Sequence, residues 1–227
     1  MLAGTMGILA GKSRARRNGG TSRDPERTRE RLVQAAFREV YRSGFQSAGL
    51  DAILAAAGVT KGALYYHFPS KEALGYAVVE EIIGPDNRGQ WLEPLQECDD
   101  PIEVLIGIVQ GLSVRPQAVR GGCALINLAQ EMSPLDAGFR KRLQAVFHDW
   151  QEGIAAVLRE GRERGKVRGD IDPNSTAGFL IAMVTGYGSL AKNSQDVKVM
   201  KTGIRNTVGW LRSLRPTGNH NRGRAHR

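Results

Sequence analysis

The chain has 227 residues, of which 41% are hydrophobic, so it is long enough and apolar enough to bury a sizeable core. Two cysteines are too few for a disulfide framework, and no apolar run reaches the roughly 18 residues of a membrane span. These features exclude a disulfide-rich secreted domain and favour a cytoplasmic protein with reduced thiols and no membrane partner.

The formal net charge of +9 lies at the two ends of the chain. Residues 1–25 carry five basic side chains and one acid, and residues 212–227 carry five arginines and no acid. We therefore predict a disordered basic arm over 1–25 and a disordered basic tail over 214–227. Because the remaining chain is neutral overall, the net charge alone does not indicate a nucleic-acid-binding body.

The first two predicted helices have clear start and stop signals. The first begins near Asp24, with Thr28 as the alternative cap, and ends at Ser43-Gly44. The second covers residues 50–57 and is closed by Gly58. Both carry apolar residues at helical spacing, so one face of each is predicted to be buried.

The third predicted helix covers residues 61–67, between a Thr60 N-cap and Pro69. Leu64 and Phe68 are predicted to be buried beneath it. Its outer face carries Lys61, Gly62, Ala63, Tyr65, Tyr66 and His67. The tyrosines could instead be core aromatics and His67 a structural histidine. Two adjacent tyrosines cannot both point inward, however, so we expect at least one to be exposed.

From residue 71 onward the chain is predicted to be helical with short breaks, and it has no alternating strand pattern. Helices are expected over about 71–83, 101–112, 123–132, 133–164, 173–191 and 197–211. Gly84-Pro85-Asp86 is expected to bend or break the chain, residues 113–122 to form a loop, and Ser133-Pro134 to cap the long helix. We predict an all-α protein with a three-helix N-terminal domain over 26–70 and a larger C-terminal helical domain over 71–213.

Residues 50–67 have the composition of a helix-turn-helix, in which one helix enters the major groove of DNA and another braces it. Ala55 to Gly58 are small enough for close helix packing. Ala63 or Tyr65 is suited to a thymine methyl group, and polar or cationic side chains are suited to phosphates. The candidate DNA contacts are Ser47, Thr60, Lys61, Gly62, Ala63, Tyr65, Tyr66, His67 and Lys71.

The segment GVTKGALYYHFPSKEAL resembles the recognition helix and the following cap of TetR/AcrR-family transcriptional regulators. The likeness covers residues 26–75, and GGCALINLAQEMSPLDAGFR is similar to the ligand-binding domain of one branch of that family. The resemblance implies an all-helical homodimer that binds a palindromic double-stranded operator. It also implies release by a small-molecule effector.

The chain departs from the family pattern before the second helix, where a Ser or Thr usually caps the helix and touches a phosphate. Here Ala48 and Gly49 occupy those positions, with Ser47 and Asp51 nearby. A lost cap costs about 1 kcal/mol. We expect a weaker start of this helix and weaker DNA affinity, unless Ser47 takes the role.

The last two helices are apolar enough to form a four-helix bundle with a second copy, and the alternative is burial within one chain. The candidate dimerisation residues are Leu180, Val184, Met200, Ile204, Val208 and Leu211.

Candidate effector contacts are Trp91, Ile108, Cys123, Ile126, Asn127, Gln130, Phe147, Trp150, Met183 and Tyr187. Core packing is the alternative for each of these, and a sensor role for Cys123 lacks an adjacent basic residue. Asn127 and Gln130 are polar amides on an apolar helix and need partners.

The sequence thus predicts a ligand-responsive transcriptional regulator, most simply a repressor. An activator or a ligand-independent DNA-binding protein is the alternative. An all-helical enzyme is a remote one, since the chain has four histidines, no HExxH motif and no paired cysteine spacing. No catalytic residue, metal or cofactor is predicted.

Overall fold

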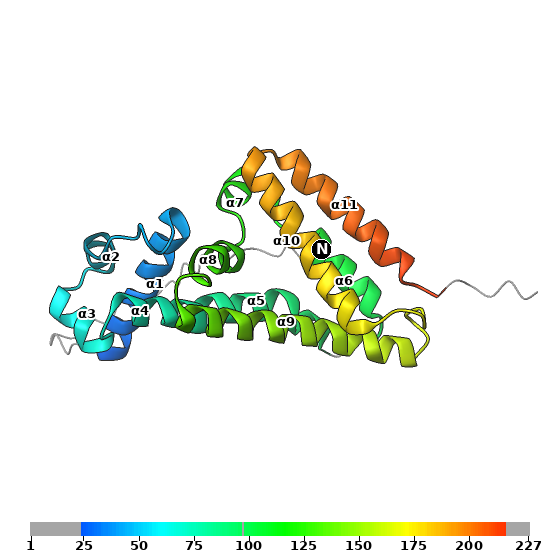
Figure 1. The fold of residues 1–227 in the computed structure, drawn as a ribbon, viewed down its shortest axis with the longest axis horizontal. Helices are drawn as coiled ribbons and strands as arrows, with labels where there is room; N and C mark the ends of the chain where they lie inside the picture. Colours follow the sequence, from blue (N-terminus) through cyan, green and yellow to red (C-terminus); the bar gives the residue numbers. More distant parts are fainter. Residues whose placement is uncertain (1–23, 97, 217–227) are drawn as a thin grey trace, which may run out of the picture. The chain divides into compact units, whose positions relative to one another are not determined.

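The computed structural model describes residues 24–96 and 98–216, and in these residues every regular element is a helix (Figure 1). This confirms the predicted all-α fold. No helix in the described ranges is both long and apolar enough to cross a membrane. The predicted basic arm and tail lie outside the described residues, apart from residues 24–25 and 214–216.

The first four helices have the bounds that their capping residues predict. They are α1 (Pro25–Ser43), α2 (Leu50–Ala57), α3 (Lys61–His67) and α4 (Lys71–Val78). The side-chain oxygens of Asp24, Thr60 and Ser70 each accept a hydrogen bond from the N–H three residues later. Each bond satisfies an amide that the start of a helix leaves unpaired. Among the described residues no side chain caps α2, which starts after Gly49.

The bend or break of the helix predicted at Gly84-Pro85-Asp86 is replaced by a π-helical turn directly before these residues, which themselves lie in α5 (Gly84–Trp91). Helix α4 continues through η1 (Val79–Ile83) directly into α5. Proline lacks an N–H, and in an α-helix its ring clashes with the carbonyl four residues earlier. The wider turn ends directly before Gly84-Pro85, so the chain accommodates the proline and stays helical.

Later elements are η2 (Glu93–Leu95), α6 (Pro101–Gln110), α7 (Pro116–Gly121), α8 (Ala124–Met132), α9 (Ala137–Glu163), α10 (Pro173–Ser194) and α11 (Val197–Ser213). The prediction of an unbroken loop over 113–122 is wrong, because Pro116 starts the short helix α7. The predicted cap of the long helix is also wrong. Asp136 takes this position, and its carboxylate accepts a hydrogen bond from the Phe139 N–H at 2.7 Å.

The described chain forms two compact units. The first comprises the described residues up to Ile83 together with Asn127–Arg142, and the second comprises Gly84–Ile126 and the residues from Leu143 onward. The division predicted after residue 70 differs, because α4 packs against α1 in the first unit. Helices α8 and α9 each contribute residues to both units.

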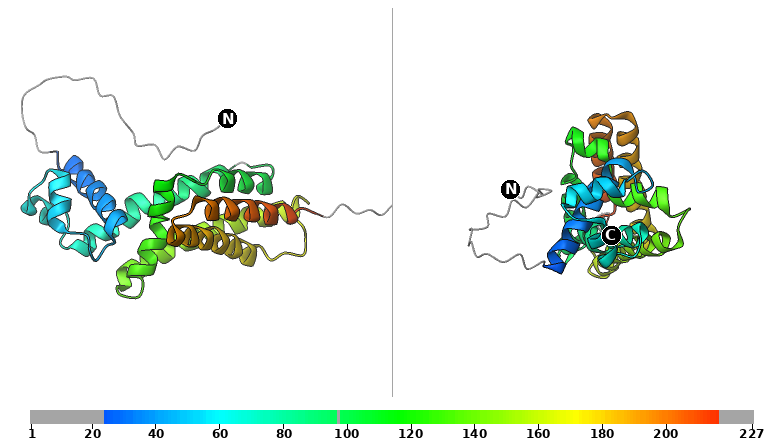
Figure 2. Two further views of the ribbon diagram at one scale, coloured as in Figure 1. Left: turned by 90° about the horizontal axis from the view of Figure 1, so that it is seen from above. Right: turned by 90° about the vertical axis from the view of Figure 1, so that its left-hand side faces the viewer.

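In the second unit α10 and α11 lie side by side (Figures 1 and 2). Gly203 on α11 lies against the ring of Tyr187 on α10, where no side chain would fit.

The predicted start of the tail at residue 214 is too early. Leu214 is buried, and the Arg215 guanidinium donates to the carboxylates of Asp100 and Glu103 at 2.9 and 2.5 Å.

The core of the first unit includes a close approach of two aromatic rings at a glycine. Phe45 and Phe139 meet edge to face with their centroids 4.6 Å apart. A Cβ on Gly75 would lie 2.5 Å from a ring carbon of each of them. Both rings are buried, so neither is free to move aside.

We expect Gly75→Ala to destabilise the protein although alanine is the better helix former. The overpacking cost of about 1–3 kcal/mol exceeds the gain in helix propensity of up to about 1 kcal/mol. Gly62→Ala, on α3 with nothing within 4 Å of the added Cβ, is the matched control and should stabilise. Thermal unfolding followed by circular dichroism measures both, and a raised midpoint for Gly75→Ala would contradict the packing.

Candidate nucleic-acid interface

Helix α3 presents an aromatic outer face to solvent. Tyr66 is 78% exposed and Tyr65 is 45% exposed, while Leu64 and Phe68 are buried beneath them. The predicted exposure of at least one tyrosine is therefore confirmed, and both are exposed. Lys61 and Gly62 are also exposed. A core helix would bury such rings, so this face is available to a partner.

His67 and Ala63 are half-buried at the edge of this outer face. The imidazole of His67 lies edge-on to the Tyr66 ring, with centroids 5.0 Å apart. Thr60 is exposed, and its hydroxyl accepts a hydrogen bond from the Ala63 N–H at 3.3 Å. The structure thus brings the rings of Tyr66 and His67 together on α3.

The turn between α2 and α3 depends on Gly58. This residue adopts φ +62°, a left-handed conformation that favours glycine, and its N–H closes the last turn of α2. Its carbonyl accepts a hydrogen bond from the Arg31 guanidinium at 3.1 Å. Helix α1 therefore supports the turn that orients α3.

The start of α2 confirms the expected lack of a cap. Ser47 is exposed and does not take the capping role. Ala48 is buried instead, where a hydroxyl would have to be satisfied. Asp51 lies in the first turn and gives the helix start the negative charge that its dipole favours.

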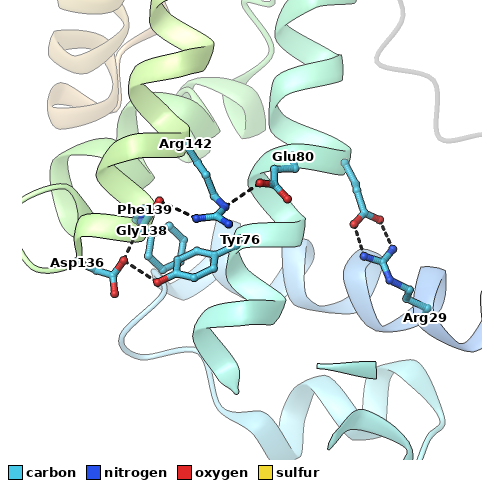
Figure 3. Close-up of polar contacts among 8 residues, drawn as sticks. Arg29, Tyr76, Glu80, Asp136, Gly138, Phe139 and Arg142 are labelled. Carbon is cyan, nitrogen blue, oxygen red and sulfur yellow. Dashed lines mark hydrogen bonds and ion pairs between the residues drawn. The ribbon is translucent and has the colours of Figure 1, made fainter. Parts of the chain in front are cut away.

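An ion pair joins α1 to the segment after α4. The Arg29 guanidinium donates to both carboxylate oxygens of Glu81, at 2.6 and 2.5 Å (Figure 3). The same guanidinium lies 5.0 Å from the centroid of the Phe68 ring, directly after α3. Because the pair is bidentate and only half-exposed, it fixes geometry more firmly than an ordinary surface pair.

A second polar cluster joins α4 and η1 to the start of α9 (Figure 3). The Tyr76 hydroxyl donates to Asp136 at 2.8 Å, and the Arg142 Nε donates to Glu80 at 2.8 Å. The Arg142 guanidinium also lies 4.1 Å from the centre of the Tyr76 ring. Hydrogen bonds from the Phe139 amide and the Tyr76 hydroxyl lower the pKa of Asp136. Desolvation and the bond to Asp136 raise the pKa of Tyr76.

Lys71, a predicted phosphate contact, lies against the loop between α1 and α2. Its ammonium donates to the Gln46 carbonyl at 3.2 Å and lies 4.8 Å from the centre of the Phe45 ring. One of its three N–H donors is thus used within the chain. Sequence reasoning missed this contact and those of Arg29, Arg31 and Arg142, since their partners are distant in sequence.

Two family models cover most of the described chain. Residues 32–78 match the model described as bacterial regulatory proteins, tetR family. Residues 104–207 match that described as tetracyclin repressor-like, C-terminal domain. The chain belongs to the TetR family. It is therefore a DNA-binding transcriptional regulator with an N-terminal helix-turn-helix and a C-terminal helical domain.

Named relatives agree with this assignment. The HTH-type transcriptional repressor DhaR of Mycobacterium sp. (strain GP1) is 31% identical over 165 residues, which cover 70% of this chain and 79% of DhaR. The transcriptional regulator AcuR of Cereibacter sphaeroides is 30% identical over 159 residues, which cover 68% of this chain and 71% of AcuR. The crystal structure of a TetR transcriptional regulator from Chloroflexus aurantiacus J-10-FL aligns with a TM-score of 0.75 and 27% identity. That alignment covers 85% of this chain and 98% of the Chloroflexus chain.

The predicted effector residues of this TetR-family chain fall into several environments. Trp91 and Trp150 are buried with ring centroids 4.9 Å apart, and Phe147 lies 6.4 Å from Trp150. Half-buried positions are held by Ile108, Ile126, Asn127, Met183 and Tyr187. Gln130 is exposed, so water can hydrogen-bond to its amide. The partner that we predicted for this amide can therefore be solvent.

Two polar groups in the second unit stand out chemically. The Nε1–H of Trp150 is buried and has no hydrogen-bond partner among the described residues. The Cys123 side chain is exposed at the start of α8, yet desolvation by the surrounding protein raises the pKa of its thiol. The thiol is thus not activated as a thiolate. No group of His, Cys, Asp or Glu suited to a metal lies within the part of the chain that the structure describes.

Most of the predicted dimerisation residues are covered by their own chain. Leu180, Val184, Val208 and Leu211 are buried, and Met200 and Ile204 are half-buried. Helices α10 and α11 pack against each other, and α6 and α7 also pack against them. The large apolar side chains that remain exposed on α10 are Phe179, at 52%, and Leu190, at 59%.

We expect Asp136→Ala to lower the unfolding midpoint by roughly 2–4 °C at pH 7, because it removes the cap of α9 and the acceptor of Tyr76. The carboxyl has a lowered pKa in the folded protein, so its stabilisation is present above its ordinary pKa of about 3.9. That stabilisation is lost as the pH falls through the folded-state value.

The gap between wild type and Asp136→Ala should therefore narrow below about pH 4. Thermal unfolding at a series of pH values measures it, and Glu30→Ala, at an exposed carboxylate of the same unit, is the control. A gap that stays constant down to pH 3 would show that the charge of Asp136 does not contribute.

Proposed function

We propose that this regulator is a repressor that binds a palindromic operator in double-stranded DNA as a homodimer and is released by a small apolar or amphipathic effector. The exposure of Tyr65 and Tyr66 on a short helix anchored by Leu64 and Phe68 carries the proposal. This arrangement gives α3 a buried side that fixes it and an outer side of large amphipathic groups. Such a helix fits the major groove.

The proposed contacts follow from the position of each group on α3 and its flanks. Gly62 has no side chain, and Ala63 has a small one, so the backbone can approach the groove closely. Tyr65 and Ala63 are suited to thymine methyl groups, while Tyr66, His67 and Lys61 are suited to phosphates. Ser47, Thr60 and Lys71 flank this surface and complete the proposed set.

The name of DhaR, a transcriptional repressor, supports repression rather than activation. We place the protein in the cytoplasm, with the operator.

The homodimer is supported by an unpartnered apolar stripe on α10. Phe179, Ala182, Gly186 and Leu190 are exposed at helical spacing, so they lie along one face. The Phe179 ring meets Trp210 of α11 edge to face at 5.0 Å, which extends the surface onto the second helix. A second copy on this face would supply a second recognition helix, and in helix-turn-helix dimers the two half-sites lie about 34–36 Å apart.

The aromatic cluster of Trp91, Phe147 and Trp150 supports an effector site in the second unit. A buried donor without a partner costs free energy until an acceptor meets it, and the Trp150 Nε1–H has no partner among the described residues. An effector with an apolar body and an oxygen acceptor fits this chemistry. With its raised pKa, Cys123 would contribute a neutral thiol.

We expect Tyr66→Ala to lower operator affinity at least tenfold while the dimer stays intact, because the ring is exposed and supports no core. Footprinting of DNA from its own upstream region locates the operator, and fluorescence anisotropy then measures the affinity. Leu135→Ala, which truncates a 61%-exposed side chain outside α3, is the control and should bind as the wild type does. Unchanged affinity of Tyr66→Ala would refute the role of this face, and absence of any protected fragment at low salt would refute operator binding.

Leu190→Glu should convert the dimer into a monomer, because it places a carboxylate in an apolar interface without a partner. Light scattering after size exclusion measures the mass of each species. Leu135→Glu makes the same change at an equally exposed leucine and should leave the dimer intact. A Leu190→Glu protein that remains dimeric would show that the stripe on α10 is not the interface.

A further inference from the structure

The loop between α1 and α2 is bound by a carboxylate from a distant part of the chain. Glu131, at the end of α8, accepts hydrogen bonds from the N–H groups of Phe45 and Gln46 at 2.8 and 2.9 Å. One oxygen serves each amide, so the pairing is bidentate. Charge-assisted bonds of this kind are about twice as strong as neutral ones.

The local sequence leaves this loop in need of such support. Helix α2 begins at Leu50, its N-cap residue Gly49 provides no side-chain cap, and the loop leads directly into it. Gly44, at the other end of the loop, has φ +84°, and a Cβ there would lie 3.0 Å from both oxygens of Glu131. A residue with a side chain at this position would therefore strain the backbone and also displace the carboxylate.

The remaining groups of the loop are held from other sides of the first unit. The Lys71 ammonium donates to the Gln46 carbonyl, and the Phe45 ring packs against Phe139. Gln46 is thus held at its N–H by an acid and at its carbonyl by a cation. These contacts leave the chain that enters α2 little freedom, although α2 lacks the usual hydroxyl.

We propose that Glu131 is a positioning residue for operator recognition. It replaces the absent cap by fixing the entry into α2, and α2 in turn braces α3 on the DNA. Glu131 lies outside residues 32–78, the segment that matches the tetR family model of the DNA-binding domain. The inference rests on the proposed operator binding, to which it adds a residue from the C-terminal part of the chain.

The sign of the effect separates positioning from simple electrostatics. Removal of a carboxylate near a DNA-binding surface should strengthen DNA binding by reducing repulsion of the phosphates. Loss of the loop contact should instead weaken operator binding, because α2 and α3 lose their fixed entry. Glu30→Gln, at an exposed carboxylate on α1, removes the same charge from the same unit and leaves both loop amides paired.

The experiment measures the affinity of full-length wild type, Glu131→Ala, Glu131→Gln and Glu30→Gln for operator DNA and for a random fragment of equal length. Amide hydrogen exchange is measured alongside, below the unfolding midpoint of each protein. Glu131→Ala should lose roughly tenfold or more in operator affinity. Its affinity for random DNA should stay unchanged or rise.

Glu131→Gln retains one acceptor oxygen and nearly the same volume, so its loss of operator affinity should be intermediate. Exchange at Phe45 and Gln46 should accelerate in both Glu131 variants and stay slow in Glu30→Gln. Glu131 variants that keep the operator-to-random ratio of wild type would overturn the inference. Wild type that does not itself distinguish operator from random DNA would overturn the proposed function instead.

Discussion

The packing of Phe45 and Phe139 over Gly75 is the contact on which the first unit depends. It brings together the loop after α1, the middle of α4 and the start of α9, which are far apart in sequence. The polar contacts of Glu131 and Tyr76 lie around these rings and are satisfied only while the rings stay in place. A helix-turn-helix built from α1 and the two short helices α2 and α3 would bury limited apolar surface by itself. The residues added from α8 and α9, such as the buried Leu128, Met132 and Phe139, enlarge this core.

The capping residues explain why the helix bounds in the first unit are readable from sequence. Asp24, Thr60 and Ser70 each act on an amide three residues away, so the information is local. The contribution of residues 127–142 to this unit is not local. In the sequence Glu131 has the pattern of an ordinary surface carboxylate. In the fold its carboxylate accepts hydrogen bonds from the amides of Phe45 and Gln46.

Apolar periodicity shows that one side of a helix is buried, and it does not show what covers that side. Val208 and Leu211 lie on the regular apolar line of α11, and their own chain covers them. The surface that we propose a second copy covers is instead marked by Phe179 and Leu190, which remain exposed on α10. For the same reason Trp91 and Trp150 were predictable as inward-facing residues, whereas the unpaired Trp150 N–H became visible only in three dimensions.

Charged and neutral side chains have different roles in the first unit, which carries the proposed DNA surface. Several cations of the first unit are already matched by acids, as Arg29 is by Glu81 and Arg142 is by Glu80. These pairs hold helices in place and leave little net positive charge among the described residues of this unit to attract phosphates without regard to sequence. In the function that we propose, discrimination between DNA sequences depends on the placement of neutral groups such as Tyr65 and Tyr66, whose contacts are short-ranged. Short-ranged contacts tolerate little misplacement of the groups that make them. A loop held at the Gln46 N–H by Glu131 and at the Gln46 carbonyl by Lys71 meets that requirement better than an uncapped helix start without such support.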